Sequence, residues 1–169
     1  RQPLILMGYL NPIMKFGFEA FCQKCVECGI DGVIIPDLPF KDYEETYKPI
    51  ADRYDIRVIM LITPETSEAR VREIDEHTDG FIYMVSSAAT TGAQKDFDSQ
   101  KQAYFKKIQD MHLRNPRMVG FGISNKQTFD AACANSSGAI IGSRFVTLLN
   151  EAEGDAEKAI TQLKEGLKK

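Results

Sequence analysis

Three stretches in the second half of the chain have residues suited to binding a phosphate group: Thr91-Gly92, Gly122 and Gly142-Ser143. A phosphate monoester needs several N–H donors at short range, and glycine lets the backbone approach where a Cβ would block it. The residues after Gly142 are typical of a helix start, whose positive end would stabilise the anion, and Ser143 is its candidate N-cap. Each stretch alone could be an ordinary turn, but together they favour a phosphate site.

Groups that could transfer protons are few in the turns that follow the apolar runs. Asp37 lies between two prolines after one such run and is the candidate acid or base. The alternative, which we favour, is a loop residue that fixes a turn or contacts a partner chain. His77 and His112 fall late in helical stretches, so no Ser-His-Asp arrangement is expected. Tyr83 is either a site residue or a core aromatic.

Cys22, Cys25 and Cys28 form a C-x-x-C-x-x-C run that resembles the start of an iron–sulfur motif. The position where a fourth cysteine is expected is Gly32, and helical spacing spreads the three thiols around the helix instead of converging them on one ion. We therefore predict buried, reduced thiols and no metal site.

Apolar runs alternate with amphipathic stretches along the chain, which is typical of parallel β–α–β units. The six strands are expected at residues 4–9, 33–36, 58–62, 81–85, 118–121 and 139–141. The helices are expected at about residues 16–28, 42–54, 67–78, 100–114, 126–134 and 155–169.

The length of 169 residues predicts a single domain. A (β/α)8 barrel takes about 250 residues, so the chain is either a complete open doubly wound sheet or a TIM barrel with roughly the last six βα units present. The sequence enters an apolar run directly after Pro3, which favours the C-terminal three quarters of a barrel. Such a chain exposes strand edges, which we expect to need a missing piece, a partner or a rearranged edge.

Composition excludes several classes of protein. The chain has 21 basic and 24 acidic residues and a net charge of -3, so no basic surface for nucleic acid is expected. No apolar run approaches the roughly 18 residues of a membrane span. The start of the chain has no secretion signal, and a cytoplasmic location is therefore the expectation.

Several motifs together resemble the tryptophan synthase alpha chain family. They are, in chain order, Gly8-Tyr9-Leu10-Asn11-Pro12-Ile13, residues 31–39 from Asp31 to Pro39, residues 80–92 from Gly80 to Gly92, and Gly120-Phe121-Gly122-Ile123-Ser124. Their order and spacing match the family over essentially the whole chain. The resemblance implies a TIM barrel that cleaves indole-3-glycerol phosphate to indole and glyceraldehyde 3-phosphate, as a lyase of tryptophan biosynthesis without a metal or organic cofactor.

The resemblance also implies roles for individual residues. The substrate-binding set comprises the phosphate-binding positions and two tyrosines, Tyr83 in the active site and Tyr9 on the indole side: Tyr9, Tyr83, Thr91, Gly92, Gly122, Gly142 and Ser143. Loops that approach a pyridoxal-phosphate beta chain, in an alpha2-beta2 complex, contain Asn11, Pro12, Asp37, Leu38 and Pro39. Pyridoxal phosphate is expected only in that partner. Ala89 and Ser87 depart from the usual sequence of the loop after Tyr83.

The catalytic pair of the family is a Glu at the end of the second strand and an Asp in the loop after it. Both are expected upstream of Arg1, so no position here inherits them, and the 169-residue polypeptide alone is expected to have negligible lyase activity. Two alternatives remain open. One is a non-catalytic fragment that only binds a phosphate ligand or the beta chain, and the other is a different phosphate-binding barrel enzyme.

Overall fold

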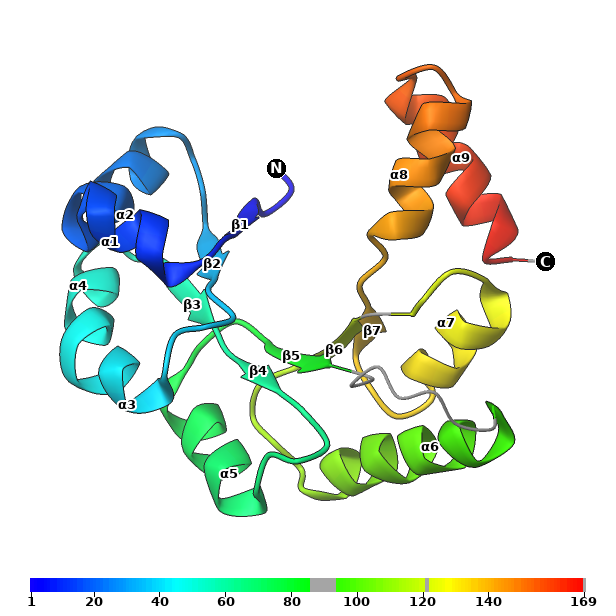
Figure 1. Ribbon diagram of the computed structural model, residues 1–169, viewed down its shortest axis with the longest axis horizontal. Helices are drawn as coiled ribbons and strands as arrows, with labels where there is room; N and C mark the ends of the chain where they lie inside the picture. Colours follow the sequence, from blue (N-terminus) through cyan, green and yellow to red (C-terminus); the bar gives the residue numbers. More distant parts are fainter. Residues whose placement is uncertain (86–93, 121, 169) are drawn as a thin grey trace. The chain divides into compact units, whose positions relative to one another are not determined.

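The structure is a computed structural model that describes residues 1–85, 94–120 and 122–168 (Figure 1). The chain divides into two compact units, which we call unit 1 (residues 1–62 and 66–82) and unit 2 (residues 63–65 and 83–169). Both contain strands connected through helices, as the alternating sequence pattern predicts. That the whole chain forms a single domain stays a prediction.

Unit 1 contains a parallel sheet in the order β1-β2-β3. The three strands are β1 (Ile5–Met7), β2 (Gly32–Ile34) and β3 (Arg57–Ile59). Leu6 pairs with Val33, and Val33 with Val58, so the carboxyl ends of the strands lie at one edge. The other elements, in chain order, are α1 (Leu10–Phe16), α2 (Phe18–Glu27), α3 (Phe40–Asp42), the π-helical turn η1 (Tyr43–Tyr47), α4 (Lys48–Arg53), β4 (Leu61–Ile62) and α5 (Glu68–His77).

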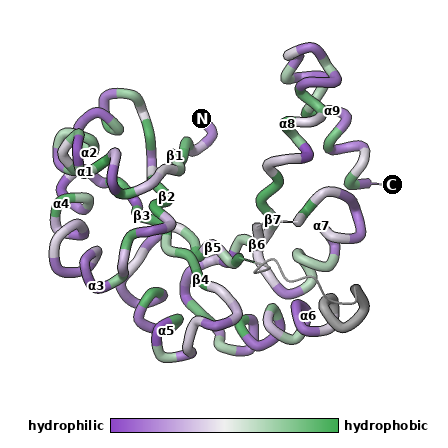
Figure 2. The backbone as a smooth tube through the Cα atoms, viewed as in Figure 1, coloured by the Kyte–Doolittle hydropathy of each residue, from purple (hydrophilic) through white to green (hydrophobic). Residues whose placement is uncertain are grey.

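The core of unit 1 is formed by the two inner strands and the helices packed on them. Val33, Val58 and Ile59 are almost completely buried. Phe18 of α2 and Tyr47 of η1 pack with ring centroids 4.7 Å apart. Figure 2 shows hydrophobic residues concentrated on the strands, which is the pattern of strands covered on both faces.

Several boundaries in unit 1 differ from the sequence prediction by a few residues, and two predicted elements are interrupted. The helix expected over residues 16–28 is interrupted at Gly17, whose φ of 94° no helix accommodates, so α1 and α2 are separate. The strand expected over residues 58–62 is divided at Met60 into β3 and β4. The second interruption separates two sheets, because β3 pairs with β2 and β4 belongs to another sheet.

The strand β1 is the end strand of its sheet, and its apolar side chains are not covered. Ile5, Leu6 and Met7 are 37%, 44% and 53% exposed, although each is of a type usually found inside. Within the described residues, β1 is thus an end strand with exposed apolar side chains. That a missing piece, a partner or a rearranged edge covers it stays a prediction.

Unit 2 contains neighbouring strands in the order β5-β6-β7. They are β5 (Ile82–Val85), of which residues 83–85 belong to unit 2, β6 (Arg117–Gly120) and β7 (Gly138–Ala139). β6 and β7 run parallel, with Val119 opposite Ala139. The helices are α6 (Gln94–Asp110), α7 (Lys126–Cys133), α8 (Ser143–Glu151) and α9 (Ala156–Gly166).

Helices α8 and α9 form a hairpin with its own small core. Leu148, Ala152 and Ala159 are buried there, and Phe145, Leu149 and Leu163 pack against them. Along the described ranges, no helix combines the length and apolar character that crossing a membrane requires.

Candidate functional site

The carboxyl end of the unit 1 sheet brings Tyr9 and Asp37 close in space. Gly8 continues the ladder after β1, because its N–H donates to the Ile34 carbonyl at 3.1 Å. Tyr9 follows as the N-cap residue of α1 and is 68% exposed. Asp37 follows β2, and its Oδ1 accepts a hydrogen bond from the Leu10 N–H at 2.8 Å. The Asp37 carboxylate therefore caps the start of α1. It does not only fix the turn in which it lies.

The residues expected to contact a beta chain are exposed except for one. Asn11 and Pro12, expected in a loop, lie in the first turn of α1, where proline is tolerated because its missing N–H has no helical partner. Pro39 is the exposed N-cap residue of α3. Leu38 is only 7% exposed, so its side chain anchors the turn and is not presented to a partner.

Tyr83 of β5 lies with its ring against Gly120, the last residue of β6. A Cβ at position 120 would overlap the Tyr83 hydroxyl, and all three of its nearest neighbours would be Tyr83 atoms. Tyr83 is 5% exposed, and burial raises the pKa of its hydroxyl, which stays protonated at neutral pH. Gly120 therefore makes the space that the Tyr83 ring occupies, a role that the sequence pattern did not reveal.

Gly122 and Gly142 differ from Gly120 because an added Cβ at either position would meet no atom of the described residues within 4 Å. Gly122 has a φ of 77°, a conformation in which glycine has no steric penalty. Gly142 has an ordinary φ of −107°. Among the described residues, neither packing nor backbone conformation requires glycine at position 142.

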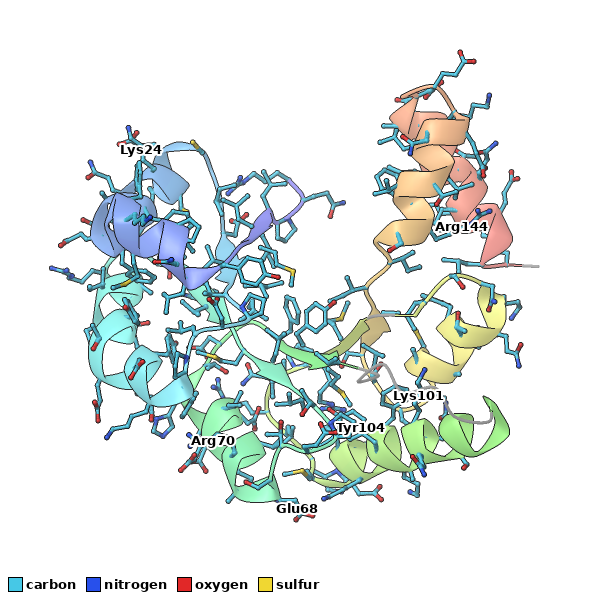
Figure 3. The ribbon with its side chains drawn as sticks, in the orientation of Figure 1. Lys24, Glu68, Arg70, Lys101, Tyr104 and Arg144 are labelled. Atoms are coloured by element: carbon cyan, nitrogen blue, oxygen red, sulfur yellow. The ribbon has the colours of Figure 1, made fainter. Side chains whose placement is uncertain are left out.

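Helix α8 begins directly after Gly142, and its start has no side-chain cap. The N-cap residue is Gly142 and Ser143 is the first helical residue, so the prediction that Ser143 is the N-cap is wrong. The first turn contains no acidic residue but does contain Arg144, labelled in Figure 3. A cation is unfavourable beside the positive end of a helix. A basic residue without an acidic neighbour in the first turn of a helix is a sequence signal for an anion, in addition to the glycines.

Two predicted phosphate-binding residues, Thr91 and Gly92, lie outside the described residues, and so do Ala89 and Ser87. The described part of the site in unit 2 therefore consists of Tyr83, Gly120, Gly122 and the start of α8.

The cysteine run lies on α2, as a helical spacing predicts, and its thiols are free. Cys22 and Cys25 are buried, and burial together with the neighbouring Cys25 raises the pKa of Cys22 to about 11. Cys28 is exposed at the C-cap, so the prediction of burial is wrong for this residue. Within the described residues, no three His, Cys, Asp or Glu side chains gather in a way that could hold a metal ion.

The fold and these strand-end residues define an α/β protein of the TIM-barrel type. The crystal structure of the tryptophan synthase alpha chain from Legionella pneumophila superimposes with a TM-score of 0.81 at 30% identity, over 98% of this chain and 61% of that one. The tryptophan synthase A-subunit from Pyrococcus furiosus gives a TM-score of 0.82 at 28% identity, over 98% of this chain and 66% of that one. The predicted barrel fold is therefore confirmed, and the open doubly wound sheet is excluded.

The chain belongs to the tryptophan synthase alpha chain family, whose model matches residues 1–169. It is 80% identical to the tryptophan synthase alpha chain of Bacteroides fragilis over 162 residues, which are 96% of this chain and 61% of that protein. It is 78% identical to that of Bacteroides thetaiotaomicron, over 98% of this chain and 64% of that protein. The chain thus spans a little over three fifths of the length of these relatives, and the family resemblance seen in the sequence is confirmed.

Proposed function

We propose that this chain contributes the phosphate-binding part and the indole side of a site for cleaving indole-3-glycerol phosphate to indole and glyceraldehyde 3-phosphate. The start of α8 carries the proposal. There, an uncapped helix N-terminus, Arg144 and an unobstructed Gly142 lie together. A phosphate dianion would accept hydrogen bonds from the first N–H groups of the helix and would offset the charge of Arg144.

The remaining residues fit the organic part of that substrate. Tyr9 is an exposed aromatic at the carboxyl end of β1, which suits contact with a flat indole ring. Tyr83 is a buried hydroxyl, and its raised pKa keeps the proton available for donation to a substrate oxygen. Tyr9 follows the carboxyl end of β1, which is the end where ligands of parallel barrels bind, and Tyr83 lies within β5.

The cleavage itself needs groups that the described residues do not supply. In a retro-aldol cleavage the indole carbon that loses the side chain takes up a proton, the carbon–carbon bond breaks, and the side-chain hydroxyl releases its proton to form the aldehyde. Among the described strand ends the carboxylates are Asp37, bound to Leu10, and Glu65, which is exposed. We therefore propose that the 169-residue polypeptide, assayed alone, binds phosphate esters with negligible turnover.

We also propose that a tryptophan synthase beta chain binds the surface formed by Asn11, Pro12, Asp37 and Pro39. These residues come from adjacent strand ends that the Asp37–Leu10 hydrogen bond holds together. Binding of a beta chain without turnover would support the alternative function of a non-catalytic binding fragment.

Calorimetric titration with glycerol 3-phosphate tests the phosphate site directly. Replacing Arg144 by Glu places an acidic side chain at the helix start, where it competes with phosphate, and we expect affinity to fall by about tenfold, equivalent to about 1.4 kcal/mol. Lys158→Glu is the matched control, because it makes the same charge reversal in the first turn of α9, a helix already capped by Asp155. Equal losses in the two variants would point to general charge, and no binding by the unsubstituted chain would refute the phosphate site.

Turnover is measured in the same preparation from the release of indole. We expect no release above the uncatalysed rate by the 169-residue chain. Release of indole at a rate that Asp37→Asn abolishes would show that Asp37 supplies the acid–base step.

A further inference from the structure

Helix α1 has no residue of its own that could cap its N-terminus. Its N-cap residue is Tyr9, whose side chain makes no capping hydrogen bond, and its first turn contains no acidic residue. Pro12 removes one of the unpaired N–H groups, but those of Leu10 and Asn11 remain. A helix start of this kind requires an acceptor from elsewhere if it is to be held in place.

Asp37 provides that acceptor from the turn after the neighbouring strand. Its Oδ1 lies 2.8 Å from the Leu10 nitrogen, across 27 residues of sequence. The carboxylate also places a negative charge at the positive end of α1, which is favourable. The turn is itself fixed, because the Leu38 N–H donates to the Ile35 carbonyl at 3.1 Å and the Leu38 side chain is buried.

Tyr9 is therefore held from both sides by the same neighbouring strand and turn. Gly8 before it is bonded to the Ile34 carbonyl of β2, and Leu10 after it is bonded to Asp37. We infer that Asp37 is a positioning residue, which fixes the backbone at Tyr9 and so sets the direction of the aromatic ring. This inference rests on the proposed function, in which Tyr9 forms the indole side of the pocket.

The role assigned to Asp37 differs from that of an acid or base in what it requires of the side chain. Capping needs an acceptor oxygen at the right place, which asparagine also offers. Proton transfer needs a group that ionises, which asparagine does not. Asp37→Asn and Asp37→Ala therefore separate the two roles.

The chain contains no tryptophan, so a Tyr9→Trp substitution introduces a single tryptophan, which can be excited at a wavelength where the tyrosines do not absorb. In this background, Asp37→Ala should lower the fluorescence anisotropy of the reporter, and Asp37→Asn should restore it. Hydrogen exchange at the Leu10 amide, measured without the reporter, should become at least about threefold faster in Asp37→Ala. Asp155→Ala is the matched control, because it removes the same kind of bond, Lys158 N–H to Asp155 Oδ1 at 3.0 Å, from α9.

The inference is overturned if Asp37→Ala leaves both the anisotropy and the Leu10 exchange unchanged, if Asp155→Ala changes the reporter equally, or if Asp37→Asn fails to restore it. Should Asp37→Ala not fold, Asp37→Glu replaces it, since the longer side chain misplaces the acceptor and should also lower the anisotropy. Neither readout requires a ligand. If the anisotropy changes as expected but the chain binds no phosphate ester, the proposed function is refuted and the positioning role of Asp37 still holds.

Discussion

The contact between Tyr83 and Gly120 leads to a prediction with a defined magnitude. A methyl group added by Gly120→Ala would overlap the hydroxyl, Cζ and Cε1 of Tyr83. The ring has little room to withdraw, since Tyr83 is 5% exposed. Inserting a methyl group into a packed interior costs about 1–3 kcal/mol. With a urea m-value of about 2 kcal/mol/M, the unfolding midpoint should fall by about 0.5–1.5 M.

The assay is urea unfolding followed by circular dichroism, in four chains that form a double-mutant cycle. In a Tyr83→Ala background the space is already empty, so Gly120→Ala should cost less than about 0.5 kcal/mol there, and the coupling free energy should account for most of the effect. Gly142→Ala is the control, because its added Cβ meets nothing and its φ is ordinary. If Gly120→Ala costs the same with and without the Tyr83 ring, the steric reasoning is wrong.

Three further predictions concern backbone conformation and pH. Gly17→Ala should destabilise the chain by about 1 kcal/mol or more. The cost is conformational, because Gly17 has a φ of 94° and an added Cβ lies 3.9 Å from its nearest neighbour. Gly166→Ala, at the last residue of α9, should stabilise the chain by at most about 0.5–1 kcal/mol in the same denaturation assay. Because burial raises the pKa of Cys22 from 9.0 to about 11, the unfolded chain loses this proton first, so the stabilisation present below pH 9 should be lost between pH 9 and 11. The loss is at most about 2–3 kcal/mol. The unfolding free energy should therefore fall less steeply with pH in Cys22→Ala than in the unsubstituted chain. Equal pH dependence in the two chains would exclude Cys22 as the source.

The sequence predicts the strands well because their signal is local. The apolar run around Val33 is buried on both faces, Val119 is buried as well, and neither run needs a distant residue to be identified. The starts of α5 and α7 are equally local, since Ser67 and Asn125 accept hydrogen bonds from the N–H groups of Arg70 and Thr128.

The sequence does not predict features that depend on which elements are neighbours. Asn11 and Pro12 have turn-like residue types, yet they begin a helix whose acceptor, Asp37, is provided by another strand end. The sequence does not distinguish Gly120 from Gly142. In the structure they differ, because an added Cβ would overlap the Tyr83 ring at position 120 and would meet no described atom within 4 Å at position 142. The motifs predicted which residues form the site, but they did not predict these two relationships.

The helix starts explain why the beginning of α8 suits an anion. Helices α5, α7 and α9 are each capped by a residue of their own, and α2 has Glu19 in its first turn. Helix α1 has neither but receives the Asp37 carboxylate. Among these, α8 alone has no side-chain cap, no first-turn acid and a basic residue at its second position. Because an uncompensated helix start is unfavourable, an anionic ligand there would stabilise α8 as well as bind to it. Phosphate should therefore raise the unfolding midpoint of the unsubstituted chain, and it should raise that of Arg144→Glu much less.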